Sequence, residues 1–134
     1  MTKVFAVSPQ HLPAVWPKAS EQIERANNIS ETGFTMDDLR EKIADGRNQL
    51  WVIDNGAASA ITSVVSYPQH KCVKVTYLGG DNMKDWFVPF VEKIEEFGRS
   101  QGCKFIETAG RKGWERMCKP LGAKLEFIVL RKAL

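Results

Sequence analysis

The chain has 134 residues, of which 43% are hydrophobic and 26% charged. This composition excludes a disordered protein and predicts one folded domain with its own core. No apolar run approaches membrane-spanning length, so we expect no membrane partner. The net charge of +3 comes from scattered residues rather than from a clustered basic stripe, which disfavours a nucleic-acid partner.

The cysteines and histidines predict neither a disulfide nor a metal site. Three cysteines are an odd number without a close pair, which indicates a reducing compartment such as the cytoplasm. The start of the chain lacks the apolar region and cleavage site of a secretory signal, so we expect the mature protein to begin there. His11 and His70 have no cysteine or carboxylate at metal-ligand spacing.

The first part of the chain predicts a strand over residues 3–7 and then two helices. Ser8 and a first-turn proline begin a helix, in which Pro17 predicts a kink or break near Trp16 and therefore two helical pieces. After a polar loop, Thr35 and Asp38 have the spacing of a capping box. They predict the start of a second helix, which the glycine at position 46 ends.

Three consecutive antiparallel strands follow. Residues 50–54 and 57–67 flank an Asn-Gly pair, which is typical of a tight hairpin turn. Residues 72–78 alternate apolar and polar side chains, as a half-buried strand does. Gly79 and Gly80 should end this strand. A long helix then presents a broad apolar face, and Pro89 is tolerable because it lies near the helix start.

The last part predicts a strand over residues 104–107, a short helix, and a final strand over residues 125–130. The short helix places Trp114, Met117, Cys118 and Leu121 on one apolar face and stops at Gly122. The elements therefore follow the order β-α-α-β-β-β-α-β-α-β in a single α/β domain, residues 1–134. A strand-helix-strand unit over residues 72–108 predicts one parallel pair in a mostly antiparallel sheet.

This order of elements resembles the fold of the GNAT (GCN5-related N-acetyltransferase) superfamily over nearly the whole chain. Two segments, LGGDNMKDW and SQGCKFIETAGRKGWERM, are similar to those of small GNAT-like proteins encoded by tailed phages. The resemblance implies an acyltransferase that moves an acetyl or other acyl group from acetyl-coenzyme A to an amine. The transfer would be direct, without a covalent enzyme intermediate.

The resemblance also implies where the coenzyme binds. The edge of the strand at Tyr77 and Leu78 would hold the pantetheine arm. The N-terminus of a helix can bind an anion. The resemblance implies that the backbone amides before and at the start of the long helix hold the pyrophosphate. These amides belong to Gly79, Gly80, Asp81, Asn82, Met83 and Lys84. Alternatively, Asp81 or Asn82 simply caps the helix. Arg111 could bind the phosphates or be a solvated surface charge.

Two departures from the superfamily pattern put the activity in question. The loop lacks the usual Arg/Gln-x-x-Gly-x-Gly/Ala signature, and Asp81 and Asp85 place carboxylates near the expected pyrophosphate. Cys118 stands where many relatives carry the tyrosine that protonates the departing thiolate, and it is either that proton donor or a core residue. Glu107 is the candidate general base, or else a surface partner of a neighbouring basic residue.

A second interpretation keeps the fold without the reaction. Some short phage GNAT-like proteins resemble internal virion or assembly proteins, and a degenerate loop with a missing tyrosine is what loss of catalysis would leave. The partner would then be a phage or host protein, in the virion or the host cytoplasm. A host-factor inhibitor also fits the sequence, which leaves the acceptor and the oligomeric state open.

Overall fold

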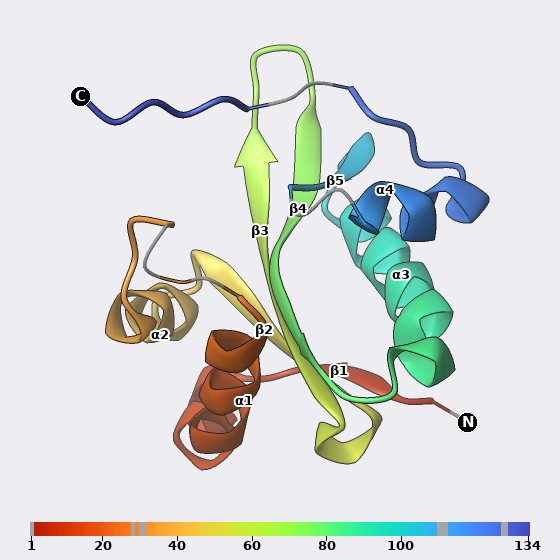
Figure 1. Ribbon diagram of the computed structural model, residues 1–134. Coiled ribbons are helices and arrows are strands. Elements are labelled where there is room, and N and C mark those ends of the chain that lie inside the picture. The colour runs from red at the N-terminus through yellow and green to blue at the C-terminus, as the bar shows by residue number, and fades with distance from the viewer. Residues whose placement is uncertain (1, 28, 30–31, 110–112, 127–128) are drawn as a thin grey trace.

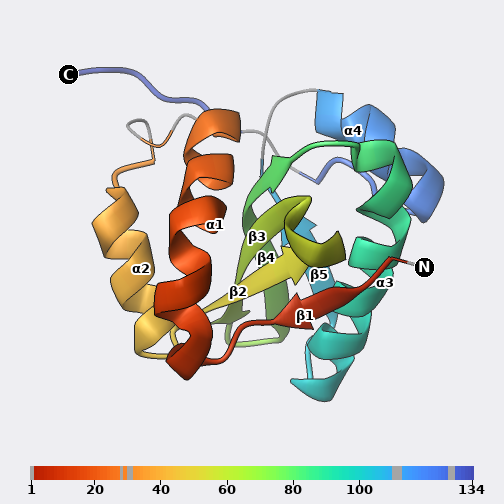
Figure 2. The same ribbon diagram turned by 90° about the horizontal axis from the view of Figure 1, so that it is seen from below.

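A mixed sheet lies between two layers of helices, with α1 and α2 on one face and α3 and α4 on the other (Figures 1 and 2). The computed structural model describes residues 2–27, 29, 32–109, 113–126 and 129–134. The strands are adjacent in chain order, and only the last pair is parallel. Their bounds are β1 Val4–Ala6, β2 Asn48–Ile53, β3 Ala58–Ser66, β4 Lys71–Gly80 and β5 Phe105–Thr108. The predicted three-strand meander and the parallel pair are confirmed.

The helices also follow the predicted order, with one correction in the first. Their bounds are α1 Leu12–Ala26, α2 Met36–Ala44, α3 Met83–Ser100 and α4 Gly113–Cys118. A short 3-10 turn, η1 Pro9–His11, precedes α1, and α1 itself continues through Pro17. The prediction of a break near Trp16 was therefore wrong. Pro13 and Pro17 both lie on the exposed face, so water can hydrate the Pro13 carbonyl that loses its helical partner.

The start of α2 confirms its predicted capping box. The Thr35 hydroxyl accepts a hydrogen bond from the Asp38 amide at 3.1 Å. The Thr35 amide in turn donates to the Asp38 carboxylate at 2.8 Å. These two bonds satisfy backbone donors that a helix start leaves open. The bond from the Thr35 amide is the main reason that the pKa of Asp38 is lowered, and the Thr35 side chain lowers it further.

Two apolar clusters, one on each face of the sheet, form the core. On the α3 face, Trp86, Phe90 and Ile94 are fully buried against the strands. On the α1 face, Ile23, Leu39 and their neighbours pack on β2, β3 and β4; this cluster consists of Leu12, Trp16, Ala19, Ile23, Ile29, Leu39, Ile43, Leu50, Ile61 and Tyr77. The helical periodicities of α1, α2 and α3 thus serve to cover both faces of one sheet.

The predicted final strand is not formed by the described residues of its range. Residues 123–126 and 129–134 belong to no strand, while 127–128 lie outside the described residues. Leu125, Val129 and Leu130 are 60%, 73% and 90% exposed. An apolar, alternating sequence forms a strand only when a sheet edge accepts its hydrogen bonds. None of the described residues of this range pairs with β5, and the C-terminus lies away from β5 (Figure 1).

No helix within the described part of the chain is long and apolar enough to cross a membrane. The same described residues contain no group of three or more His, Cys, Asp or Glu side chains that could hold a metal ion.

Candidate functional site

A fork between β4 and β5 is the main irregularity of the sheet. The parallel pairing of these strands ends at Val75 opposite Thr108, although β4 continues to Gly80. At the same point the pairing of β4 with β3 shifts register, because Ile61 pairs with Tyr77 and Thr62 with Val75. Thr76 is the extra residue of a β-bulge, and a bulge bends its strand. The edge of β4 from Thr76 to Gly80 is therefore free of β5.

The bulge also decides which backbone groups face this free edge. Before it, the Val75 carbonyl points toward β5, where it accepts a hydrogen bond from the Thr108 hydroxyl at 3.0 Å. One extra residue reverses the alternation of a strand. Beyond the bulge, the Leu78 carbonyl accordingly leaves the ladder and accepts a hydrogen bond from the Asn27 amide side chain at 3.2 Å. The free edge thus carries backbone hydrogen-bonding groups that a bound chain-like molecule could use.

The two glycines at the end of β4 are required by contacts within the protein. The sequence predicted that the strand ends at Leu78, but β4 includes both glycines and ends at Gly80, because Gly79 and Gly80 pair with Ser59 and Ala58 of β3. A Cβ on Gly79 would lie 2.2 Å from the Gln22 carbonyl oxygen of α1. A Cβ on Gly80 would lie 2.3 Å from the Ala58 Cβ, and the φ of Gly80 is +150°. The absence of side chains therefore lets α1 and β3 approach β4 closely.

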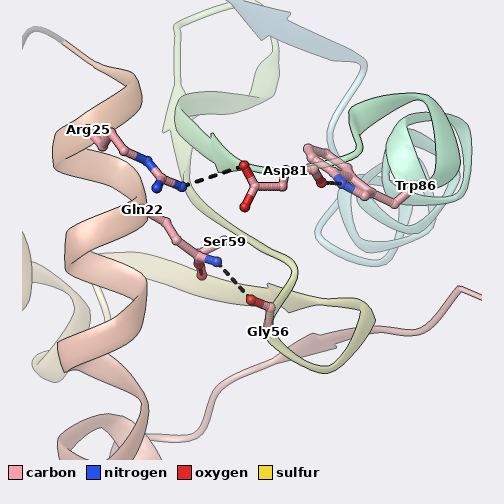
Figure 3. Close-up of polar contacts among 6 residues, drawn as sticks. All are labelled: Gln22, Arg25, Gly56, Ser59, Asp81 and Trp86. Carbon is pink, nitrogen blue, oxygen red and sulfur yellow. Dashed lines mark hydrogen bonds and ion pairs between the residues drawn. The ribbon is translucent and has the colours of Figure 1, made fainter.

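Helix α3 begins directly after these glycines with backbone amides near the free edge. Its N-cap is Asn82, in the left-handed conformation, and the Asn82 side chain makes no capping hydrogen bond. Asp81 does not cap the helix either, since its carboxylate turns toward Arg25 of α1 (Figure 3). Asn82 therefore has the N-cap position that the alternative gave to Asp81 or Asn82, but without the capping hydrogen bond of its side chain. The Trp86 ring nitrogen instead holds the turn by donating to the Asp81 carbonyl at 2.6 Å.

The last turns of α1 bring two polar side chains to this end of the sheet, which the sequence reasoning missed. Arg25 Nη2 lies 3.7 Å from Asp81 Oδ1, and both side chains are largely exposed. Gln22 is buried, donates to the Gly56 carbonyl at 2.7 Å and accepts from the Ser59 hydroxyl at 2.6 Å (Figure 3). A glutamine on the apolar stripe of a helix was the available signal for this contact. Arg25 offsets one of the two carboxylates that the sequence placed near the expected pyrophosphate.

Helix α4 lies beside the first turns of α3, as the Phe87 and Trp114 rings show with centroids 5.9 Å apart. Cys118 is half-buried and packs with Trp114 against the apolar cluster on the α3 face. Burial raises the pKa of the Cys118 thiol, so the thiol is neutral at ordinary pH. A neutral thiol holds a proton that it could give to a stronger base.

Glu107 lies on the other face of the sheet. It borders a shallow groove of about 640 Å³ beside the β3–β4 turn, which Tyr67, Pro68, Gln69 and His70 also line. Glu107 interacts with the thiol of Cys72, whose pKa is raised to about 11 by burial and, secondarily, by Glu107. His70 is half-buried, between the rings of Tyr67 and Phe105.

The structure thus brings some of the predicted site residues together and separates others. Residues 77–84 form one continuous strand end, turn and helix start beside the fork. Side chains alternate between the faces of a strand, which places Glu107 opposite the face on which Cys118 packs. Arg111 lies outside the described residues.

Comparison with known proteins identifies the fold. No family model and no curated protein sequence matches the chain. The solved structures that it resembles include an aminoglycoside acetyltransferase from an uncultured soil metagenomic sample, with a TM-score of 0.77 and 13% identity over 100% of this chain and 99% of that one. A GCN5-related N-acetyltransferase from Ralstonia eutropha has a TM-score of 0.74 and 14% identity, over 99% of each chain. A predicted acetyltransferase with acetyl-CoA from Clostridium acetobutylicum has a TM-score of 0.69 and 10% identity, over 99% of this chain and 96% of that one. Structural similarity at such low sequence identity establishes the fold but not the activity. The chain therefore has the GNAT fold.

Proposed function

We propose that the protein is an acyl-coenzyme A-dependent N-acyltransferase whose coenzyme binds in the fork between β4 and β5. The observation that supports this proposal is the free edge of β4 beyond the bulge at Thr76, which leads directly to the start of α3. An extended amide-containing arm can hydrogen-bond to such an edge as an added strand does. An anionic group can bind the free amides of a helix start.

The coenzyme would use two kinds of contact in this site. Its pantetheine arm would lie along the edge at Tyr77 and Leu78, where it would compete with the Asn27 side chain for the Leu78 carbonyl. Its pyrophosphate would meet the amides of the turn and the ammonium group of Lys84. The Asp81 carboxylate repels an anion, and the nearby Arg25 guanidinium reduces that repulsion.

The transfer itself needs two proton movements. The attacking amine loses a proton as its nitrogen bonds to the thioester carbonyl carbon, and the departing coenzyme thiolate gains one when the carbon–sulfur bond breaks. We propose Cys118 for the second step, because burial keeps its thiol protonated. Glu107 is the proposed base for the first step. Its position in the groove at the β3–β4 turn would require the acceptor amine to approach from the α1 face.

Titration calorimetry with acetyl-coenzyme A tests the binding step. The wild-type chain should release or absorb measurable heat, and Lys84→Ala should weaken binding about fivefold, the effect of losing about 1 kcal/mol of solvent-screened attraction. Asp81→Asn should strengthen binding by a similar factor, since it removes a like charge. Lys93→Ala, further along the same helix, is the matched control and should leave affinity unchanged. No heat at millimolar acetyl-coenzyme A would contradict the proposal.

A turnover assay tests the two side chains. Release of the coenzyme thiol would be followed with a panel of amines, including aminoglycosides because one solved structure of similar fold is a complex with sisomicin. Cys118→Ala should lower kcat and remove the basic limb of the pH profile if Cys118 donates the proton, whereas Cys118→Ser should restore part of the rate. An unchanged pH profile in Cys118→Ala would assign this cysteine to packing alone.

The second candidate is a GNAT-like protein without catalysis, with a phage or host protein as partner. Two observations favour it. The Asn27 side chain already donates a hydrogen bond to the Leu78 carbonyl, which the pantetheine arm would need. The Asp81 carboxylate adds a negative charge to the turn where the pyrophosphate would bind. This candidate predicts no coenzyme binding by wild type or by Asp81→Asn. Mass spectrometry of purified phage particles should then find the chain at a fixed copy number.

A further inference from the structure

The unusual backbone conformations of the described residues are concentrated in two turns at one end of the sheet. Asp54, Asn55 and Asn82 are the non-glycine residues with a positive φ in the described part of the chain. The first two lie in the β2–β3 turn, which is the 3-10 turn η3 Asp54–Gly56, and Asn82 is the N-cap of α3. Such conformations cost free energy, so surrounding contacts must hold them, and they are frequent at ligand-binding sites.

The two turns are joined to each other through the backbone. The Asp81 amide donates a hydrogen bond to the Ala57 carbonyl at 3.0 Å. The adjacent residues, Ala58 and Gly80, pair across β3 and β4, and a Cβ on Gly80 would lie within 2.4 Å of the Ala58 Cα. The two turns are therefore in close backbone contact. A displacement of the β2–β3 turn would also displace the turn between β4 and α3.

A buried side chain of α1 holds the β2–β3 turn. Gln22 is 6% exposed, and its Nε2 donates a hydrogen bond to the Gly56 carbonyl at 2.7 Å (Figure 3). Its Oε1 accepts a hydrogen bond from the Ser59 hydroxyl at 2.6 Å. Because Gly79 has no side chain, the Gln22 backbone carbonyl can also lie directly against the end of β4. Gln22 thus contacts both the β2–β3 turn and the strand that leads into the β4–α3 turn.

We propose that Gln22 is a positioning residue of the coenzyme site. This inference rests on the proposed function, in which the β4–α3 turn binds the pyrophosphate. Gln22 is buried, so it acts through other residues: its bond to Gly56 fixes the β2–β3 turn, and the bond between Ala57 and Asp81 then fixes the β4–α3 turn. A turn that is already ordered binds an anion without the entropic cost of ordering its amides. Gln22 therefore matters for the phosphates of the coenzyme rather than for its pantetheine arm.

Amide hydrogen exchange, followed by NMR on the protein without ligand, tests the first half of this proposal. Gln22→Leu removes the bond to Gly56, so the Asp81 amide should exchange about tenfold faster through local opening of the turn. Ser59→Ala is the matched control, because it removes the other hydrogen bond of the Gln22 side chain and leaves the bond to Gly56. The Ile94 amide, in the core helix α3, reports any loss of overall stability. Equal exchange of the Asp81 amide in the two variants would overturn the proposal.

Titration calorimetry with two ligands tests the second half. Gln22→Leu should weaken the binding of acetyl-coenzyme A about tenfold and leave the binding of S-acetylpantetheine, which lacks the pyrophosphate, unchanged. Ser59→Ala should retain the wild-type affinity for both ligands. Unchanged affinity of Gln22→Leu for acetyl-coenzyme A, or equal weakening of both ligands, would overturn the proposal.

Two further checks keep the outcomes distinct. If the wild-type chain binds neither ligand, the proposed function fails, while the exchange of the Asp81 amide still decides whether Gln22 holds the turn. Circular dichroism shows whether each variant is folded. Gln22→Met replaces Gln22→Leu if the leucine variant is unfolded, because the unbranched methionine side chain adapts to irregular space.

Discussion

The part of the chain up to Gly98 and the part after it differ in how completely they bury their apolar side chains. Both core clusters draw their buried members from residues 4–94. Among the described residues after Gly98, none is buried, although several are large and apolar. The first part therefore holds the buried core residues of the described chain. The second part adds only partly buried side chains to that core, among them Cys103, Trp114 and Cys118.

A matched pair of phenylalanines gives the largest expected contrast between the two parts. Phe90 is 1% exposed and Phe105 is 49% exposed. Phe90→Ala should lower the free energy of unfolding by about 3 to 5 kcal/mol, because it leaves a cavity in the core. Phe105→Ala should lower it by less than ~1.5 kcal/mol, because water already covers half of that ring. Urea denaturation of both variants measures the difference, and equal losses would contradict the division.

A pair of glycines should give a smaller contrast. Gly80→Ala places a Cβ against the backbone and side chain of Ala58, so it should destabilise the fold by about 3 kcal/mol. Gly102 has a φ of +77° but nothing within 4 Å of its Cβ position, so Gly102→Ala should cost only ~1 kcal/mol of backbone strain. Thermal unfolding of the two variants ranks them. A milder effect at Gly80 would mean that β3 and β4 can separate without loss of stability.

An acid titration should show the smallest effect, at the capping box of the first part. The folded-state pKa of Asp38 is lowered by its hydrogen bonds with Thr35. Its stabilisation is therefore present above the ordinary value of 3.8 and is lost as the pH falls through the lower folded-state value. Asp38→Asn should flatten the acid limb of the stability profile, while Asp37→Asn, one residue earlier, serves as the control. Identical acid limbs in both variants would contradict this role of Asp38.

The sequence predicted the elements well where side-chain periodicity determines them. The helical stripes of α2 and α3 and the alternation in β4 are local patterns, and the structure confirms them. The break in α1 was wrong because solvent exposure of the prolines, which periodicity does not report, makes the lost hydrogen bond inexpensive. The described residues of the predicted final strand, 125–126 and 129–130, form no strand, because a strand depends on an accepting edge that the local sequence does not report.

The sequence predicted only those parts of the candidate site that are consecutive in the chain. Residues 77–84 stay together because they are consecutive, whereas Arg25 reaches Asp81 and Asn27 reaches Leu78 only through the packing of α1 on the sheet. The bulge at Thr76 has no side-chain signature, since threonine is common in regular strands. The roles of Glu107 and Cys118 remain predictions, as does the likeness to phage proteins.

The bulge at Thr76 has a consequence for how such a site can change. A single added residue both ends the contact with β5 and reverses the side chains that follow, so the opening and the apolar pattern of Tyr77 and Leu78 are linked. A strand that ran regularly through Thr76 would turn Tyr77 from the α1 face to the α3 face, whereas deleting Thr76 would keep Tyr77 opposite Ile61 on the α1 face. The apolar pattern of this strand end therefore fits either the bulge or the loss of the whole residue, but not a regular strand that keeps Thr76.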